Sequence, residues 1–542
     1  MEFLKKMTRS KKNIIVSLIL IAAISTISLI LIPNMSDGHD IDFHLSRITT
    51  IKNCFDMGES CRRVYPNYYV GYGYASPMFY PDIFLYIPSF LRHLGISLIM
   101  SYKIFIFIIS ACSIFSMYIS VKGITKNKES AIFSAILYGF SSYRLVDLFT
   151  RGALGESLSF IFLPIIIYGI YEIIYRDYKK FYLLVIGMSG LVLSHVVSLY
   201  IVVIFLTISC LVNVKRLFLD KKRIAYLLIS ALITLMITAF FIFPLLEQLL
   251  NDKFLLGQAN PTSLYEGTVP IWALFLEFTY RHYFSDWIPP GIGIGAVILV
   301  YLYFRNRKYT DGFTKFCFGA GLICLIFSTK IFPWKLFQNT LEPIQFPWRI
   351  YMLTTVLLCI GGGLLVEKLP KSENKYIKII LCSFLIPVIS IISANFTEYN
   401  VKGIKKITPA YGEYLTEKVV YDGDHDRGEV VTSDYPMDIM FVRKGINITI
   451  DFTNNKEKNN LELPLIYYKG YQAVLNGEKL NVFQTNKGLV GVELGVVESG
   501  KVQVGYGGTT MQKASDYVSL ITAILFIGYV ITIKVKKYKR SE

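Results

Sequence analysis

The chain has 542 residues, of which 53% are hydrophobic and 15% aromatic, with 56 Lys and Arg against 39 Asp and Glu. A mean hydropathy of +0.46 excludes an ordinary soluble globular protein and is typical of a chain that crosses the membrane several times. The net charge of +17 does not indicate a nucleic-acid-binding protein. About half of the basic residues stand in short clusters between apolar segments, which is the pattern of cytoplasmic loops.

The apolar segments predict an all-α polytopic membrane domain of about twelve spanning helices, since one crossing takes roughly 20 residues. The basic clusters place both chain ends in the cytoplasm. Residues 181–212 are expected to form a tight re-entering pair that turns near His195, and residues 83–95 an interfacial helix. The predicted spans are 14–33, 98–120, 131–149, 156–175, 181–194, 197–212, 224–246, 290–304, 313–330, 350–368, 376–394 and 516–535.

This topology places all six histidines at or beyond the outer membrane face, so any chemistry is expected to be extracytoplasmic. Six of the eight cysteines lie within apolar segments, where they act as small hydrophobic residues. Cys54 and Cys61 lie in the first outer loop, where they either pair or share one helical face.

Residues 396–515 break the apolar pattern and predict a small extracytoplasmic all-β domain. Residues 446–452 alternate with the period of a half-buried strand, residues 474–480 indicate a hairpin around an Asn-Gly turn, and residues 501–506 indicate a further strand. The expected organisation is a transmembrane domain (1–395, with its first outer loop at 34–97), a β domain (396–515) and a C-terminal anchor with a basic tail (516–542).

An acidic, histidine-bearing cluster follows the first span. Its members are Asp37, His39, Asp40, Asp42 and His44. So many ionisable groups are costly near lipid unless they bind or react with something. A helix that begins near Asp40 would place Asp40 and His44 on one face, with Arg47 one turn further. Such a face offers a general base, an imidazole and a guanidinium for phosphate, with His39 beside it as a substrate ligand.

Two other interpretations of this cluster stay open. Asp40 and His44, together with Asp37, form a weak candidate site for a divalent cation such as Mg²⁺ or Mn²⁺. Asp37, which is also a second candidate base, and Asp42 are equally suited to cap the helix. An ordinary solvated loop is the remaining alternative.

The second cluster lies between two predicted spans and contains Arg144, Asp147, Arg151 and Glu156. In the functional interpretation, Arg144 or Arg151 grips a phosphate or pyrophosphate group while Glu156 orients a sugar hydroxyl. Asp147 and Arg151 are four residues apart, so the plain alternative is that they pair with each other.

Two further candidates lie at the same membrane boundary. His195 is at the tip of the proposed re-entering pair, where a lone histidine is often only a structural donor. Arg349 closes the motif Gln345-Phe346-Pro347-Trp348-Arg349 and is a second candidate phosphate ligand. A Trp and an Arg at a span end also suit an aromatic belt with a snorkelling side chain.

Several further motifs follow one another along nearly the whole chain. They are Gly38-His39-Asp40 with Phe43-His44-Leu45 and Arg47-Ile48, Gly71-Tyr72-Gly73-Tyr74 with Phe79-Tyr80-Pro81-Asp82, Arg151-Gly152-Ala153-Leu154-Gly155-Glu156, Gln345-Phe346-Pro347-Trp348-Arg349, and Tyr467-Tyr468-Lys469-Gly470-Tyr471 with Asn476-Gly477. Each motif is modest alone, but in their order and spacing they resemble the bacterial YfhO-like membrane proteins, within the GT-C class of glycosyltransferases.

The resemblance implies an enzyme of the bacterial cell membrane that moves a hexosyl or N-acetylhexosaminyl group from a polyprenyl-phosphate carrier to an envelope acceptor, for example lipoteichoic acid. In the GT-C class an early acidic residue of the first outer loop is base or metal ligand, and Asp40 matches it. The implied partners are the lipid-linked donor, the glycan acceptor, the lipid bilayer and an enzyme that makes the donor, with no nucleic acid.

Two other functions compete with glycosyl transfer. A transporter or flippase of lipid-linked glycans would also place arginines at phosphate depth, but it predicts polar groups in paired broken helices near the bilayer centre. A non-catalytic envelope scaffold would leave the clusters degenerate. The charged residues collect at the outer rim, and the chain has no Walker or dinucleotide glycine loop.

Overall fold

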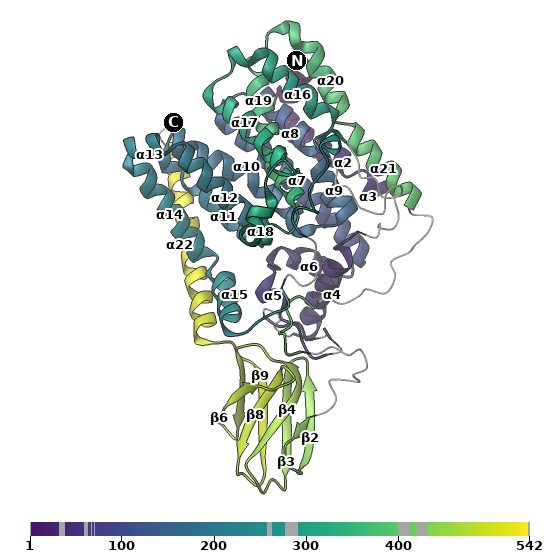
Figure 1. The fold of residues 1–542 in the computed structure, drawn as a ribbon, viewed down its shortest axis with the longest axis vertical. Helices are drawn as coiled ribbons and strands as arrows, with labels where there is room; N and C mark the ends of the chain where they lie inside the picture. Colours follow the sequence, from purple (N-terminus) through teal and green to yellow (C-terminus); the bar gives the residue numbers. More distant parts are fainter. Residues whose placement is uncertain are drawn as a thin grey trace. The chain divides into compact units, whose positions relative to one another are not determined.

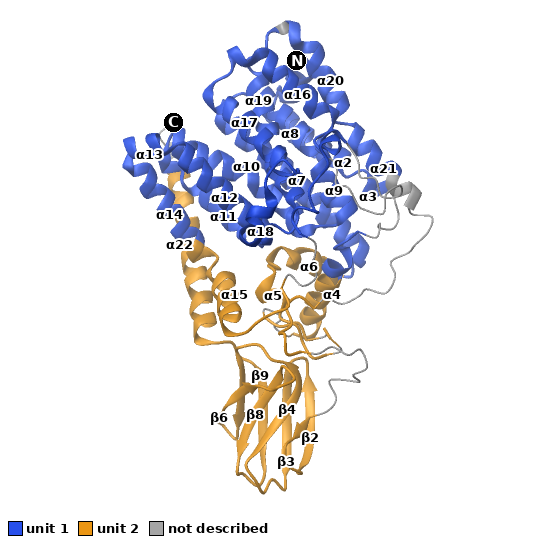
Figure 2. Ribbon diagram, in the orientation of Figure 1, with its two compact units in different colours: residues 1–45, 95–234, 262–407 blue, residues 46–94, 235–261, 408–542 orange. Residues whose placement is uncertain are grey.

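The computed structural model describes residues 2–31, 38–58, 63–66, 68–69, 71–256, 263–276, 291–398, 412–419 and 431–539. The chain divides into two compact units (Figure 2). Unit 1 comprises residues 1–45, 95–234 and 262–407, and unit 2 comprises residues 46–94, 235–261 and 408–542. The predicted domains follow the order of the sequence, whereas each unit gathers three separate stretches of chain.

Unit 1 is helical (Figure 1). Two helices cross its boundary, since α4 (Ile41–Met57) and α14 (Lys221–Ile237) begin in unit 1 and end in unit 2. The others are α1 (Glu2–Thr8), α2 (Lys11–Ser25), α3 (Ser28–Leu31), α7 (Leu98–Thr125), α8 (Lys128–Gly139), α9 (Ser142–Val146), α10 (Leu154–Tyr175), α11 (Tyr182–Val192), α12 (Val196–Val212), α13 (Val214–Leu219), α16 (Gly293–Asn306), α17 (Gly312–Phe327), α18 (Trp334–Leu341), α19 (Tyr351–Val366), α20 (Asn374–Ser383) and α21 (Ile386–Glu398).

Helix α19 is the buried centre of unit 1, and every residue in it is buried. Small residues let neighbouring helices approach it closely, as is usual between membrane helices. A Cβ atom at Gly363 would lie 2.1 Å from Ser134 Oγ of α8, and Ser134 Oγ donates a 2.8 Å hydrogen bond to Cys359 O. Between α10 and α11, a Cβ atom at Gly169 would lie 2.6 Å from Leu184 N.

Five helices of the described residues are long and apolar enough to cross a membrane, and α14 with α15 (Ala239–Asn251) forms a sixth span if this pair, bent by 77°, is counted as one. The predicted multi-pass character is confirmed, while the count of twelve stays a prediction. Several predicted spans are interrupted. Residues 131–149 divide into α8, α9 and the start of a π-helical turn at Asp147–Arg151, because the α8 hydrogen-bond ladder ends near Phe140.

Unit 2 contains α5 (Ser76–Phe79), α6 (Tyr86–His93), α15, α22 (Thr510–Lys539) and two antiparallel sheets. One sheet has the order β1-β4-β8-β7, and the other has the order β2-β3-β9-β5-β6. The strands are β1 (Thr432–Ser433), β2 (Asp438–Lys444), β3 (Asn447–Thr453), β4 (Asn459–Ile466), β5 (Tyr471–Leu475), β6 (Glu478–Leu480), β7 (Val482–Gln484), β8 (Leu489–Gly495) and β9 (Gly500–Tyr506).

The predicted strands are confirmed. Residues 446–452 form β3, in which Ile448, Ile450 and Phe452 are buried on one face. Residues 501–506 belong to β9, which pairs with both β3 and β5. The predicted hairpin joins β5 and β6 through Asn476 and Gly477, whose φ angles of 49° and 97° fit a type I′ turn.

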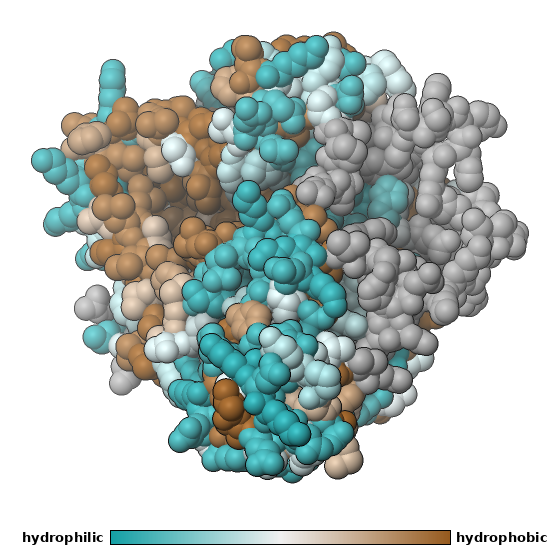
Figure 3. Space-filling model, turned by 60° about the horizontal axis from the view of Figure 1, so that its bottom comes forward, coloured by the Kyte–Doolittle hydropathy of each residue, from teal (hydrophilic) through white to brown (hydrophobic). Residues whose placement is uncertain are grey.

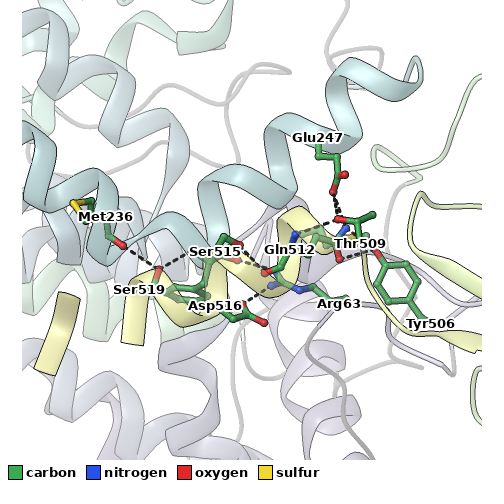
Figure 4. A network of polar contacts seen from close by, with 11 residues as sticks. Arg63, Met236, Glu247, Tyr506, Thr509, Gln512, Ser515, Asp516 and Ser519 are labelled. Atoms are coloured by element: carbon green, nitrogen blue, oxygen red, sulfur yellow. Dashed lines mark hydrogen bonds and ion pairs between the residues drawn. The ribbon is translucent and has the colours of Figure 1, made fainter. Parts of the chain in front are cut away.

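A polar network within unit 2 joins α22 to α15 (Figure 4). Ser519 Oγ accepts a hydrogen bond from Phe240 N and donates one to Met236 O, so it satisfies main-chain groups exposed where α14 gives way to α15. Arg63 donates to Phe240 O and pairs with Asp516 at 2.7 Å. The bend is therefore held by side chains that supply the hydrogen bonds a straight helix would make.

Many apolar side chains are exposed on the helices, as expected for a surface in contact with lipid. Helix α22 alone exposes Leu520, Ile521, Ile524 and Leu525. Figure 3 shows hydrophobic side chains gathered over a broad area of one face, beside a hydrophilic area. The predicted interfacial segment 83–95 contains α6, on which Ile87 and Phe90 are exposed while Ser89 is buried and donates to Ile48 O.

The β5–β6 turn gives a test of the fold. Gly477→Val places a β-branched residue in the left-handed region, at a cost of about 1–2 kcal/mol. No heavy atom lies within 4 Å of the added Cβ, so the penalty comes from the backbone alone. Amides of β5 and β6 should exchange with deuterium about 5–30-fold faster, measured by mass spectrometry. Glu478→Val, at an exposed strand position, is the control and should leave exchange unchanged; equal rates in both variants would contradict the turn assignment.

Candidate active site

Arg151 is the centre of a buried charge cluster in unit 1. Its guanidinium is buried and forms ion pairs with Asp147 and, at 2.9 Å, with Glu156 Oε2. The plain alternative drawn from the sequence, in which Asp147 and Arg151 pair, is therefore confirmed. Both carboxylates are almost fully buried, so each depends on this pairing for its stability.

Glu156 links Arg151 to a distant part of the chain. Its Oε1 accepts a hydrogen bond from the Tyr143 hydroxyl, and its Oε2 lies 3.7 Å from Arg349 Nε. Arg349 also donates to Ile344 O at 3.3 Å and to the side chain of Gln345. The predicted second cluster and the motif that ends at Arg349 thus meet in space. Glu156 lies between Arg151 and Arg349.

Aromatic rings enclose this cluster. The Arg151 guanidinium lies 4.4 Å from the centroid of the Trp348 ring, a cation–π arrangement. The Trp348 ring stacks on Phe346 at 5.1 Å, and Tyr143 approaches Trp348 edge-on. These rings keep water from the ion pairs, which strengthens them.

Local backbone geometry positions these side chains. Asp147–Arg151 forms a π-helical turn, a feature often found at functional sites. Gly152 ends the turn with φ +63°, and a Cβ atom there would lie 2.1 Å from Ile41 Cγ1. Helix α10 then begins at Leu154, so Glu156 lies in its first turn, where the helix dipole favours a negative charge.

The first predicted cluster reaches the same place through its backbone. Asp40 N donates a 3.0 Å hydrogen bond to Arg151 O, and a Cβ atom at Gly38 would lie 3.0 Å from the same oxygen. Asp40 is half-buried and His39 exposed, immediately before α4. His44 lies one turn into the helix, as predicted, but it is buried, at 2% exposure. Asp37 lies outside the described residues.

His195 belongs to the electrostatic surroundings of the cluster. It lies between α11 and α12, where its ring Nδ1 caps α12 by accepting from Ser198 N at 3.3 Å. It interacts electrostatically with Glu156, Arg151 and Arg349. A turn at residues 193–194 separates α11 from α12, as predicted, while the re-entering arrangement and a role for His195 in the site stay predictions.

Two predicted phosphate ligands are engaged in structural contacts. Arg144 is buried and donates to Gly139 O and to Ser110 Oγ, at 3.0 and 2.9 Å. Arg47, counted with unit 2, donates to Tyr80 O and Pro81 O and lies over the Tyr80 ring. These contacts give both arginines a packing role, and their binding of a substrate stays a prediction.

Tyr143 and Trp348 are members of the site that the sequence did not single out. Trp348 occurs in a motif that ends with the candidate ligand Arg349, Tyr143 directly precedes Arg144, and aromatic residues are too common in this chain for their type to be a signal. Two buried polar atoms, Asp147 Oδ2 and Arg349 Nε, have no hydrogen-bond partner among the described residues. Such atoms also occur elsewhere in the described residues, so they do not by themselves mark the site.

Unit 1 and its buried polar cluster define a multi-pass membrane protein with a candidate site at one end of several helices. The family described as "6-pyruvoyl-tetrahydropterin synthase related domain; membrane protein" matches residues 78–399, more than half of the chain. The chain belongs to this family. The match includes Arg151, Glu156 and Arg349, and it agrees with the membrane-protein family predicted from the motifs.

Two individual proteins are also similar. An uncharacterized protein of Lactococcus lactis subsp. cremoris (strain MG1363) is 22% identical over 584 aligned positions, which cover 94% of this chain and 93% of the relative. The archaeal oligosaccharyltransferase AglB from Archaeoglobus fulgidus, solved with an inhibitory peptide and a dolichol-phosphate, matches 73% of this chain at 13% identity and a TM-score of 0.39. The match spans 57% of the AglB chain.

The cluster predicts a strong coupling between Glu156 and Arg349. Glu156→Gln leaves two buried guanidinium groups opposite one carboxylate, and we expect a loss of about 3 kcal/mol in the free energy of unfolding. Arg349→Gln in the same chain should restore part of this loss, with a coupling energy above about 0.5 kcal/mol. Unfolding of the purified variants in detergent, followed by circular dichroism, measures both values; strictly additive losses would contradict the pairing.

Asp82, near Arg47 in unit 2, gives a pH-dependent test. Burial raises the pKa of Asp82 to about 6, although Arg47 and the Tyr65 hydroxyl favour its charged form. The folded protein therefore holds this proton more tightly than the unfolded chain, and stability falls as pH rises from about 4 to 6, by at most about 3 kcal/mol.

Asp82→Asn removes this dependence. The unfolding temperature of the variant, compared with that of the wild type between pH 4 and 7, should become relatively higher as the pH rises. Other carboxyls cancel in the comparison, so a constant difference would show that Asp82 titrates normally.

Proposed function

We propose that the protein transfers a sugar from a polyprenyl-phosphate carrier to an acceptor hydroxyl on the extracytoplasmic side of the membrane. The observation that carries the proposal is the main-chain hydrogen bond from Asp40 to Arg151. It fixes a half-buried carboxylate beside a buried, charge-paired cluster. Because it is half-buried, this carboxylate is accessible to a substrate. The buried ion pairs beside it keep the local geometry fixed.

Asp40 is the proposed general base. It takes the proton from the acceptor hydroxyl, whose oxygen then forms a bond to the anomeric carbon. The bond between that carbon and the phosphate oxygen breaks, and the polyprenyl phosphate leaves with the bonding electrons. One displacement of this kind inverts the anomeric centre. His39 is proposed to orient a sugar hydroxyl. Glu156, whose two oxygens are already paired, is proposed to hold Arg151 and Arg349 in position, with His195 near it.

The arginines act on the leaving group. Arg349 Nε has no hydrogen-bond partner among the described residues, so it can donate to a phosphate oxygen as negative charge develops there. Arg151 is proposed to act on the phosphate electrostatically, without direct contact, because its guanidinium is already paired with Asp147 and Glu156. The sugar, and an acceptor such as lipoteichoic acid or another wall polymer, are proposals that follow from the YfhO-like resemblance.

A divalent cation at Asp40 and His44 stays a prediction. Within the described parts of the chain, no group of three or more His, Cys, Asp or Glu side chains is placed to hold a metal ion. His44 is also far more buried than Asp40.

A transporter of lipid-linked glycans is the second candidate, because α14 and α15 form a sharply bent pair. Inverted-repeat transporters carry such breaks in both halves, whereas the described residues contain one. The two functions differ in their product: a transporter moves the lipid-linked sugar unchanged, and the proposed enzyme releases free polyprenyl phosphate.

Asp40→Asn should reduce transfer by a factor of about 10²–10⁴, the contribution typical of a general base. The measurement uses membranes with equal amounts of wild type or variant, a radiolabelled polyprenyl-phosphate sugar and cell-envelope acceptor. Released polyprenyl phosphate and labelled acceptor are both quantified.

Asp42→Asn is the matched control, since Asp42 is also half-buried and lies two residues away on the same helix end. It should transfer at the wild-type rate. Equal transfer by the wild type and Asp40→Asn would move the base elsewhere, and transport without release of polyprenyl phosphate would favour the transporter.

A further inference from the structure

The buried cluster has no net positive charge with which to bind a donor phosphate. Arg151 and Arg349 supply two positive charges, and Asp147 and Glu156 supply two negative ones. A donor phosphate adds further negative charge, and the cluster holds no surplus cation to meet it. A binding site for that phosphate before the reaction therefore requires positive charge elsewhere in unit 1.

Two lysines in the α17–α18 connection supply it. Lys330 Nζ and Lys335 Nζ lie 5.0 and 4.4 Å from the centroid of the Tyr265 ring. Both lysines are exposed, and Tyr265 is half-buried. No carboxylate of the described residues lies within 4.0 Å of either ammonium group. Two such groups on one ring repel each other, and a bound anion removes that repulsion.

The segment that carries these lysines is rigid. Trp334 is fully buried, and its indole N–H donates to Phe327 O and Thr329 O at 3.0 and 3.2 Å. Leu264 N, beside Tyr265, donates to Gln338 Oε1 of α18 at 2.9 Å. The main chain that carries Tyr265 and both lysines is therefore held in place before any ligand arrives.

Apolar side chains alternate with the lysines. Ile331 follows Lys330 and is 61% exposed, and Leu336 follows Lys335 and is 81% exposed. Phe337 is exposed beside them, and the segment joins the apolar helix α17 to the span at Pro347–Val366. An exposed surface that combines ammonium groups with large apolar side chains at the end of a span matches a phosphate attached to a hydrocarbon chain.

This surface is continuous with the charge cluster. A Cβ atom at Gly267, two residues from Tyr265, would lie 3.4 Å from Pro347 Cδ and 3.6 Å from Phe346 Cδ1. The Phe346 ring in turn lies 5.3 Å from the Arg349 guanidinium. A ligand at Tyr265 is thus separated from Arg349 by one layer of side chains.

We propose that Lys330, Lys335 and Tyr265 form the binding site for the phosphate of the isoprenoid donor, with Ile331 and Leu336 contacting its hydrocarbon chain. This inference rests on the proposed function. It makes the two lysines the first contact of the donor phosphate, and the same phosphate meets Arg349 after the donor has moved inward to react.

The test measures binding of radiolabelled polyprenyl monophosphate to the full-length protein in phosphatidylcholine nanodiscs. K330A/K335A should lose about tenfold or more in affinity, which corresponds to the loss of one charge-assisted contact. K330R/K335R should retain binding, since the charge is kept. Both lysines are exposed, so neither change disturbs the fold.

K308A/K375A is the matched control. Lys308 and Lys375 each lie over a neighbouring tyrosine ring of unit 1, at 4.9 and 5.0 Å. Their replacement should leave binding unchanged. If K330A/K335A binds as tightly as the wild type, the site is wrong.

Competitors identify the ligand chemistry. Unlabelled polyprenyl phosphate should displace the label, and polyprenol or phosphatidylglycerol at the same concentration should not. Displacement by polyprenol would show that the phosphate is not recognised, and equal displacement by phosphatidylglycerol would show a general anionic-lipid site; either result overturns the proposal.

The transfer assay separates this inference from the proposed function. Asp40→Asn should bind the donor normally and fail to transfer its sugar. A wild type that binds the donor through the lysines without transferring sugar would disprove the enzyme and keep the site. Normal binding and transfer by K330A/K335A would disprove the site and keep the enzyme.

Discussion

Unit 1 depends on the placement of Arg151 between two buried carboxylates. Removing a guanidinium and two carboxylates from water costs several kcal/mol for each ion, and only close pairing with further hydrogen bonds recovers that cost. The π-helical turn, Gly152 and the first turn of α10 bring the partners together, and Arg349 and Tyr143 complete the shell around Glu156. Elements far apart in the sequence are thereby fixed to one another by charge.

The parts of the fold that the sequence predicts well are governed by local rules. The alternation in β3 and the Asn476-Gly477 turn depend on neighbours within a few residues, so the strands and the hairpin are recognisable without tertiary information. The multi-pass character follows from hydropathy alone. The break after α14 is different, because α14 ends where a side chain from elsewhere takes over its main-chain hydrogen bonds. This side chain, Ser519, lies more than 270 residues from Phe240.

In the candidate site, too, some features follow from the local sequence and others only from tertiary contacts. The sequence singles out Asp147, Arg151, Glu156, His195 and Arg349, because ionisable residues at span ends are rare, and the structure brings them together while their roles stay predictions. Their spacing cannot decide between mutual pairing and ligand binding, and the structure shows pairing for Asp147 and Arg151. Nor can it show that Asp40 approaches Arg151 through its main chain, since that contact joins segments more than 100 residues apart. Lys330 and Lys335 attract no notice in the sequence, because only the fold brings Tyr265 to them.

A charge-balanced cluster suits catalysis better than it suits tight ground-state binding. If Arg151 and Arg349 both held the donor phosphate at rest, they would stabilise substrate and transition state alike, which raises affinity without accelerating the chemical step. In the proposed reaction, Arg349 Nε instead donates to the phosphate oxygen on which negative charge appears as the glycosidic bond breaks. In the proposed site, exposed lysines and apolar side chains supply binding energy for the intact donor before its phosphate, and the anomeric carbon bonded to it, reach the cluster. Under this proposal the lipid carrier is captured from the bilayer while the buried ion pairs keep the geometry around Asp40 unchanged.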